Sequence, residues 1–279
     1  MARRSPVFAR HCMASSSSPL ATQVGFKVLS EGGNAFDAAL AMAGMMSVVE
    51  PMMSGLGGDT MIIAWSAKSK KVIGLNGSGV APTGVQPAKF TGNPFVPEHG
   101  VNSVTIPGAV DGWCRLLEKF GTKPLAKLWE PAIGYARDGF PVGESIAGFW
   151  ALSAPSLRKF ATPNLQKVLL PGGKPPSPGQ LVRFPQLAAT LEFVAKKGRD
   201  GFYKGPVAAA IADTLTAGGV RTTTEEIAGQ ESLWVEPLRV GYRGREVLGL
   251  PPNSQGIVAL LALGILEGYN LAAMGASER

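Results

Sequence analysis

The segment "SGLGGDT", residues 54–60, places three glycines and one carboxylate directly before the apolar run "MIIAW". Such a loop could hold a phosphate, bind a metal ion or form a tight turn. A dinucleotide-binding loop needs the order strand, G-x-G-x-x-G, helix, so that the phosphate meets a helix N-terminus. Here a helical pattern precedes the loop, a strand follows it, and Thr60 replaces the third glycine. The Gly-Lys-Ser/Thr of a P-loop is also missing, so the pattern argues against phosphate binding.

The remaining choice is between a metal site and a turn. Asp59 offers a single carboxylate, whereas a hard cation needs several oxygen ligands. A turn requires only that Gly55, Gly57 and Gly58 adopt backbone angles or close approaches that a side chain would hinder, with Asp59 capping the turn or reaching a nearby site. We therefore predict a structural turn at the three glycines and no metal.

Histidine and cysteine are too scarce for a zinc cluster. The chain holds two of each, His11, His99, Cys12 and Cys114, which is too few at useful spacing for a structural zinc site. Two cysteines this far apart favour reduced thiols over a disulfide. We predict neither a metal nor another cofactor.

Two hydroxyl-rich runs are candidates for a nucleophile. Ser15–Ser18 has no His or Asp arrangement around it and is predicted to be a flexible entry to the fold. In "RTTTEEIA", Thr222 and Thr223 each have a Glu three residues later, which is the spacing of a capping box at a helix start. We assign no catalytic role to these threonines.

Composition describes a globular chain of 279 residues, 45% of them hydrophobic, with a net charge of +7. Much of the excess charge lies in "MARRSPVFARH" at the start, and no basic stripe carries interleaved aromatic residues, so nucleic-acid binding is not supported. No run approaches the ~18 apolar residues of a membrane span. Without an apolar signal region, a cytoplasmic location is favoured, although the Arg- and Ser-rich residues 1–18, predicted to be flexible, leave an organellar transit peptide open.

Hydrophobic periodicity predicts a mixed helix and strand fold in one large domain or two small ones. Asn34, with Asp37 three residues on, is typical of a helix start. The predicted helices cover about residues 20–29, 35–49, 109–120, 185–197 and 205–217, a helical pair before Gly139, and the last apolar run from 256. The predicted strands form hairpins within 60–76 and 237–252, while residues 79–100 and 154–183 are predicted to be irregular.

Several of these segments occur together in a known order. The runs "GGNAFDAALA", "VVEPMMSGLGGD", "VTIPGAVDGW", "GFYKGPVAAAIADTL" and "PLRVGYRGREVLGLPPNSQGIVALLALGILEGYN" resemble the gamma-glutamyltranspeptidase family of N-terminal-nucleophile hydrolases. The resemblance extends from about Arg4 to Leu271, nearly the whole chain. Each motif is moderately specific alone, and their common order is strong.

The resemblance implies an α+β fold, the four-layer αββα sandwich of these hydrolases. In the family, a precursor cuts itself into a large N-terminal and a small C-terminal chain. The new terminal Thr of the small chain is the nucleophile, and its own α-amine is the base. Residues 19–279 would be the large-subunit region, truncated before the small subunit, so the sandwich would be incomplete. The catalytic Thr would lie outside the chain, leaving this fragment inactive alone.

One departure from the family bears on the substrate. True transpeptidases place an Arg shortly after the first hairpin, where its planar fork can bind the α-carboxylate of a γ-glutamyl group. In "GLNGSGVAP" the matching position is Ser78, which supplies no charge. The loop form "GLGGD", with Asp59, resembles the acylase-like and oxamate amidohydrolase-like branches. The resemblance therefore implies Ser78 and Asp59 as substrate-binding residues, for a γ-glutamyl group or another small amide.

The implied partner is the small C-terminal chain of the same precursor. The alternative is a non-catalytic binding or interaction module that keeps the first half of the fold. A metal- or nucleotide-dependent enzyme is disfavoured by the missing ligand clusters and the reversed glycine loop. We expect the isolated chain to expose apolar strand edges around Met61–Trp65 and Val247–Leu250, and hence to be poorly soluble or oligomeric.

Overall fold

Two helices are the first elements along the chain in the computed structural model, which describes residues 5–92 and 95–275. Helix α1 (Pro19–Ser30) packs on α2 (Ala35–Val49). The predicted cap at the start of α2 is confirmed as a full capping box: the Asp37 N–H donates to Asn34 Oδ1, and the Asn34 N–H donates to Asp37 Oδ2, both at 2.9 Å. The Asp37 carboxylate, fully buried, also accepts the Thr122 N–H at 2.8 Å, which ties this helix start to a second connection.

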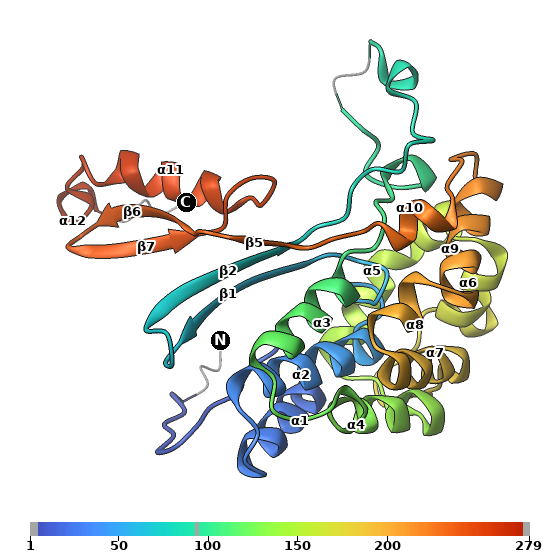
Figure 1. Ribbon diagram of the computed structural model, residues 1–279, viewed down its shortest axis with the longest axis horizontal. Coiled ribbons are helices and arrows are strands. Elements are labelled where there is room, and N and C mark those ends of the chain that lie inside the picture. The colour runs from blue at the N-terminus through green and yellow to red at the C-terminus, as the bar shows by residue number, and fades with distance from the viewer. Residues whose placement is uncertain (1–4, 93–94, 276–279) are drawn as a thin grey trace.

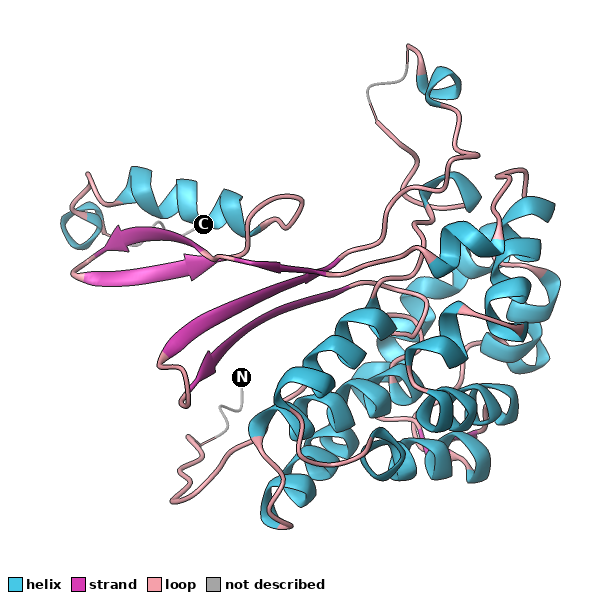
Figure 2. Cartoon of the chain, viewed as in Figure 1, coloured by secondary structure: helices cyan, strands magenta, loops and turns pink. Residues whose placement is uncertain are grey.

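The helices before β5 form one body on one side of the molecule (Figure 2). After α1 and α2 it contains α3 (Ala109–Phe120), α4 (Leu125–Asp138), α5 (Glu144–Phe160), α6 (Pro163–Leu169), α7 (Pro185–Lys197), α8 (Arg199–Tyr203), α9 (Pro206–Ala217) and α10 (Thr224–Ala228). Helix α4 lies between α2 and α7. The fully buried Trp129 of α4 packs on α2 and donates its indole N–H to Leu40 O at 3.0 Å. The main hydrophobic core therefore lies between these helices.

A three-stranded antiparallel sheet runs along this body. Strand β2 (Lys71–Gly77) lies between β1 (Thr60–Ser66) and β5 (Leu233–Val235). Thr60 of β1 pairs with Gly77, and Leu233 of β5 pairs with Asn76. The last residues of β2 are therefore paired with both neighbouring strands. Because side chains alternate along a strand, one face packs on α3 and the other points away from the helices.

The last part of the chain forms a separate hairpin–helix unit. It contains β6 (Leu238–Tyr242), β7 (Arg245–Gly249), α11 (Gly256–Leu266) and the short α12 (Leu271–Met274), with α11 packed on both strands. In Figure 1, helices α1 and α2 lie below the β1–β2 sheet, and the β6–β7 hairpin and then α11 lie above it. Helix, sheet, sheet and helix layers follow one another, which confirms the predicted α+β class and layer order.

The prediction of an irregular segment over 154–183 is largely wrong. Helix α5 continues through Pro155 to Phe160, and α6 follows at once, with Thr162 Oγ1 accepting the Leu165 N–H at 3.3 Å as its cap. A proline removes one helical hydrogen bond and usually ends a helix, but here the helix goes on, and the buried Trp150 packs on the core before it. The shorter elements are β3 (Phe140–Pro141), β4 (Leu181–Val182) and the 3₁₀ turns Pro87–Phe90, Val101–Ser103 and Pro171–Gly173.

The segment before α1 forms no helix or strand over residues 5–18, while residues 1–4 lie outside the described part of the chain. Ser17 Oγ donates to Glu50 Oε2 at 2.9 Å, which fastens this segment to the end of α2. The flexibility expected for residues 1–18 stays a prediction. Over the described ranges, every helix falls short of the length and apolar character needed to cross a membrane.

Gly44→Ala tests the packing of α2 on α4. An added Cβ would lie 2.5 Å from the Trp129 ring, and such overpacking destabilises a core by about 1 to 3 kcal/mol. The matched control is Gly134→Ala in α4, whose added Cβ meets no atom within 4 Å, and which should stabilise by about 0.5 to 1 kcal/mol because Gly is a poor helix former. Urea unfolding measures both, and equal effects would contradict the packing argument.

Candidate functional site

Asp59 and Ser78 lie side by side at one end of the β1–β2 hairpin. Because Thr60 pairs with Gly77, the residues just beyond these strand ends are neighbours. Asp59 Oδ1 accepts the Gly79 N–H at 2.8 Å, so the carboxylate is fixed to the segment that carries Ser78. Asp59 is exposed and Ser78 half-buried. The two residues singled out as substrate-binding are therefore brought together at one sheet edge.

The glycine loop forms a turn against the start of α3. The Gly58 N–H donates to Gly55 O at 3.3 Å, and Gly58 O accepts the N–H groups of Gly108 at 3.0 Å and Ala109 at 2.9 Å. A Cβ added at Gly57 would meet no described atom within 4 Å, and one at Gly58 only Gly55 O at 3.6 Å. The close approach to a strand that we expected of Gly57 and Gly58 does not occur among the described residues, and the need for glycine at Gly55, Gly57 and Gly58 stays a prediction.

The close backbone contact lies at two other glycines. A Cβ at Gly79 would be 1.7 Å from Ile106 O, and one at Gly108 would be 2.2 Å from Gly77 O. Both positions therefore require glycine, because the segment after β2 runs against the segment before α3. Sequence reasoning missed them, although the glycines of "GSGV" and "IPGA" were the available signal.

Three residues that sequence reasoning also missed hold Ser78 in place. The Ser78 N–H donates to Asn76 Oδ1 at 2.9 Å, Ser78 Oγ accepts from Asn253 Nδ2 at 2.6 Å, and Ser78 O accepts from Gln230 Nε2 at 3.1 Å. Asn253 and Gln230 lie more than 150 residues from Ser78 along the chain. No local pattern signals such contacts, which only the topology creates.

Gln230 belongs to a segment that the half-buried Arg199 holds through its backbone carbonyls. Its side chain is 2% exposed, and its Oε1 also accepts the Val80 N–H at 3.4 Å. Arg199 donates from Nη2 to Ala228 O at 3.0 Å and to Gln230 O. The backbone that presents Gln230 to Ser78 is thus positioned by a guanidinium from α8.

A fully buried carboxylate, Asp111 of α3, completes this network. It accepts from Arg199 Nε, from Arg115 Nε at 3.0 Å and from the Ser232 N–H at 2.6 Å. Burial alone would raise the pKa of Asp111, but the hydrogen bonds from Arg199 and Ser232 outweigh it and hold the pKa below its usual value. Asp111 is therefore an ionised anchor, with both oxygens occupied by donors.

The side chains beside Asp111 are structural. Tyr203 donates its hydroxyl to Pro107 O at 2.7 Å and accepts the Asp111 N–H at 3.0 Å, and burial raises its pKa. Burial also raises the pKa of Cys114 to about 12. A thiol that stays protonated is not a nucleophile. Cys114 and Cys12 are both free thiols, as predicted.

Comparison with known proteins decides the family. The sequence model of gamma-glutamyltranspeptidase matches residues 21–279, nearly the whole chain. The chain belongs to the gamma-glutamyltranspeptidase family. It is 38% identical over 252 residues to the glutathione hydrolase-like YwrD proenzyme of Bacillus subtilis, covering 90% of this chain and 48% of that one.

Acylases of the same family show a similar degree of sequence identity to this chain. The acylase ACY 1 proenzyme of Pseudomonas sp. strain SE83 is 34% identical, with 98% of this chain and 50% of that one covered. The crystal structure of cephalosporin acylase from Bacillus halodurans superposes with a TM-score of 0.88 at 36% identity, covering 96% of this chain and 51% of that one. The acylase-like branch of the gamma-glutamyltranspeptidases, and the N-terminal-nucleophile hydrolase fold, are thereby confirmed. The chain spans about half the length of the curated relatives it matches.

In this family member the threonine cluster caps a helix. Thr223 Oγ1 accepts the Glu226 N–H at 3.2 Å and Glu226 Oε2 accepts the Thr223 N–H at 2.8 Å, the predicted capping box. Thr222 is buried and donates to Val220 O at 3.0 Å. In the described ranges, no cluster of three or more His, Cys, Asp and Glu side chains could hold a metal ion.

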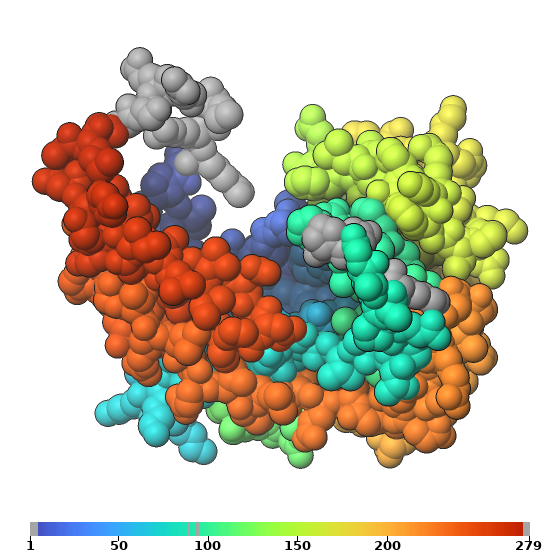
Figure 3. All heavy atoms as spheres, turned by 90° about the horizontal axis from the view of Figure 1, so that it is seen from above, coloured from blue at the N-terminus to red at the C-terminus, as the bar shows by residue number. Residues whose placement is uncertain are grey.

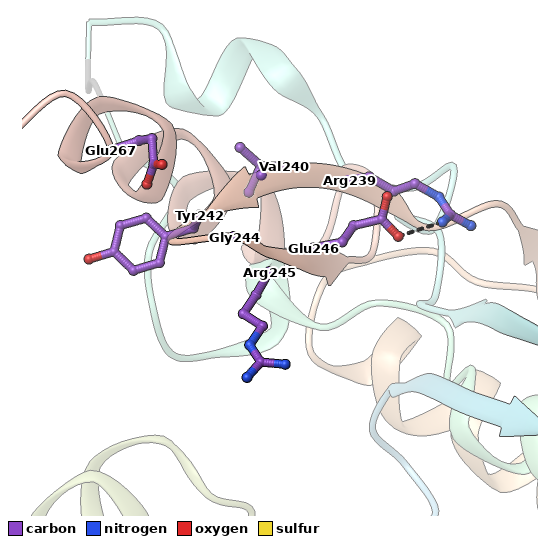
Figure 4. Close-up of a pocket in the computed structure, with 8 residues that line it drawn as sticks. Arg239, Val240, Tyr242, Gly244, Arg245, Glu246 and Glu267 are labelled. Atoms are coloured by element: carbon purple, nitrogen blue, oxygen red, sulfur yellow. Dashed lines mark hydrogen bonds and ion pairs between the residues drawn. The ribbon is translucent and has the colours of Figure 1, made fainter.

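A hollow of about 650 Å³ lies elsewhere, on the β6–β7 hairpin (Figure 4). Arg239 and Glu246, both of which line it, form an ion pair at 2.7 Å, and Arg245 lines it as well. Glu267 Oε2 accepts the Arg243 N–H at 2.8 Å. Arg239 and Glu246 pair with each other on this exposed hairpin, and neither Asp59 nor Ser78 lines the hollow.

Asp111→Asn should cost about 3 to 5 kcal/mol at pH 7, because Arg199 and Arg115 lose the buried anion that compensates them. The hydrogen bonds from Arg199 and Ser232 hold the pKa of Asp111 in the folded protein below the ordinary value of an aspartate. Its stabilisation is therefore present above about pH 4 and is lost as the pH falls through the folded pKa. Urea unfolding of both proteins from pH 7 to about pH 3 should show the difference narrowing in acid.

The control for this titration is Asp138→Asn, since Asp138 pairs with Arg137 at 3.0 Å on the exposed surface. Exposed pairs contribute little, so stability should hardly change. A difference between Asp111→Asn and the parent that stays constant down to pH 3 would contradict an ionised Asp111 anchor.

Proposed function

We propose that this chain is the N-terminal, large-subunit part of a self-processing amide hydrolase or acyltransferase, and that its partner is the small C-terminal chain of the same precursor. The family membership supports the enzyme class. The matched relatives are named as proenzymes, and the chain covers about half of each. These facts favour a chain that corresponds to the first half of a proenzyme and functions together with the second half.

The observation that carries the proposal is an uncovered apolar face on the β1–β2–β5 sheet. Met61, Ile63 and Trp65 on β1 are 41%, 45% and 60% exposed, and Leu233 on β5 is 58% exposed. They lie on the face away from α3 because their neighbours along each strand pack inward. A soluble protein rarely leaves such a patch open unless something binds it.

The second hairpin unit is uncovered in the same way. Helix α11 is apolar on all sides, yet Val258, Leu261 and Ile265 are 58%, 62% and 66% exposed. Seen from above, the surface is hollowed between the red C-terminal residues and the green-to-yellow residues, with blue residues of the first helices at its floor (Figure 3). Additional strands and helices from a second chain would cover these faces and extend both sheets.

The proposed reaction is acyl transfer by a terminal threonine of the small chain. Its hydroxyl oxygen would attack the amide carbonyl carbon while its α-amine accepts the hydroxyl proton. The C–N bond then breaks, the leaving amine takes up that proton, and an ester links the acyl group to the threonine. Water or another amine attacks the ester and releases the acid or a new amide.

The role proposed for this chain is to bind the acyl part of the substrate at Ser78 and Asp59. A guanidinium at the position of Ser78 could hold a carboxylate with two charge-assisted hydrogen bonds. Ser78 offers a neutral hydroxyl, and the charged group joined to its neighbour Gly79 is the anion Asp59. This pair supports an amide with an acyl group other than γ-glutamyl, such as an acyl side-chain amide.

Expression of the complete open reading frame tests the proposal. We expect two chains on a denaturing gel, a threonine as the N-terminal residue of the smaller one, and slower amide hydrogen exchange in β1 and α11 than in the isolated chain. We also expect the isolated 279-residue chain to self-associate and the two-chain protein to be monodisperse. A single uncleaved chain without amidase activity would support the non-catalytic interaction module instead.

Ser78→Arg in the processed enzyme tests the substrate assignment. A charge-assisted hydrogen bond contributes about 1.5 to 3 kcal/mol, so kcat/KM for a γ-glutamyl anilide should rise about tenfold or more. Ser78→Met, of similar length but uncharged, is the control and should give no rise. Equal rates in all three proteins would contradict a substrate-binding role for residue 78.

A further inference from the structure

Asn76, Ser78 and Asn253 form a closed ring of three hydrogen bonds at the end of β2. The Ser78 N–H donates to Asn76 Oδ1 at 2.9 Å, Asn76 Nδ2 donates to Asn253 Oδ1 at 3.0 Å, and Asn253 Nδ2 donates to Ser78 Oγ at 2.6 Å. Each member is both a donor and an acceptor within the ring. We call it the polar ring.

The polar ring leaves several donors unused. Each asparagine amide carries two N–H groups, and the ring uses one of each. The Ser78 hydroxyl has Gly79 O nearest at 3.4 Å, which is longer than the 2.5–3.0 Å of an O–H···O bond. Its hydrogen is therefore available to another acceptor. The ring thus offers up to three neutral donors around one hydroxyl.

The charge beside the ring is negative. Asp59 Oδ1 accepts the Gly79 N–H at 2.8 Å, directly after Ser78. Over the described ranges, no Lys or Arg side chain bonds or ion-pairs with Asp59, Ser78 or either asparagine. A neutral acceptor would bind the ring's donors at no electrostatic cost, whereas a carboxylate at the same place would be repelled by Asp59.

Asn253 reaches the ring because the C-terminal unit docks on the same strand. It lies in the turn between β7 and α11. Leu250, at the end of β7, packs so closely on β2 that a Cβ at Gly74 would lie 2.9 Å from its Cδ2. The docking fixes the height of the turn above β2, and the two asparagines then set the direction of the Ser78 hydroxyl.

We infer that Asn76 and Asn253 are positioning residues for Ser78 and that the polar ring, with Asp59, selects an uncharged acyl group bearing a carbonyl acceptor over one bearing a carboxylate. The inference rests on the proposed function and names the substrate class for the same site. Ser78 would donate its hydroxyl hydrogen to the acyl carbonyl, and the spare amide N–H groups would add to that contact.

Two matched anilides test this selectivity in the processed, full-length enzyme. Carbamoylbutanoyl-p-nitroanilide and glutaryl-p-nitroanilide share the scissile amide and chain length and differ only in a terminal carboxamide or carboxylate. Release of p-nitroaniline gives kcat and KM for each, per mole of processed enzyme. The parent enzyme should prefer the carboxamide by about tenfold, the size expected when one hydrogen bond and one repulsion distinguish two ligands.

Two variants separate positioning from general structure. Asn253→Ala opens the ring and should lower kcat/KM for the carboxamide about tenfold, with little change for the carboxylate, so that the preference disappears. Asp59→Asn keeps an oxygen for the Gly79 N–H but removes the charge, and should raise use of glutaryl-p-nitroanilide several-fold. Asn164→Ala changes another exposed asparagine, on α6, and should alter neither substrate.

Each result decides one point. Loss of the preference in Asn253→Ala, together with a gain in Asp59→Asn, supports the inference. Equal use of both anilides by the parent, or an equal loss on both in Asn253→Ala, overturns it while leaving the amidase function intact. If the parent cleaves neither anilide nor a γ-glutamyl anilide, the proposed function falls and the inference falls with it.

Discussion

A buried carboxylate, Asp111, is the contact on which the rest of the sheet depends. Removing an ion from water costs several kcal/mol, so a buried charge persists only where donors surround it. Asp111 has Arg199, Arg115 and the Ser232 N–H around its two oxygens. These bonds join α3 and α8 to the segment before β5. Trp234 then packs edge-on against Phe120 of α3, with ring centroids 5.8 Å apart, and the strand is fixed on the body.

Hydrogen bonds to backbone groups connect this anchor to Ser78. Arg199 holds the carbonyl of Gln230, and the Gln230 side chain holds the backbone of Ser78 and Val80. The segment after β2 has no freedom to shift, since Gly79 lies directly against Ile106. The hydroxyl and carboxylate that face solvent are thus supported by a buried network, which is how a site on a sheet edge keeps a defined geometry.

Local sequence patterns predicted most of the helices and strands, whereas contacts between residues distant in the sequence were not predicted. The bounds of α2, α3 and the β1–β2 hairpin follow from the Asn34 cap, the helical spacing and the apolar run "MIIAW" followed by a polar turn. Helix α5 was not predicted at all, and its residues from 154 on were assigned to an irregular segment, whereas in the structure the helix continues past Pro155 to Phe160. The roles of Gly79 and Asn253 depend on which residues, distant in the sequence, the fold places next to them. These contacts cannot be predicted from the local sequence pattern.

The same reasoning explains how one scaffold can serve different amides. A guanidinium or a serine after β2 changes the charge of the site without altering β1, β2 or the Asp111 network beneath them, because residue 78 is half-buried and its backbone bonds to Asn76 and Gln230 do not involve its side chain. The side chain is then free to vary while its position stays fixed. In this chain, Ser78 Oγ bonds to Asn253, and the nearby carboxylate of Asp59 would make the electrostatic potential negative at the proposed substrate site.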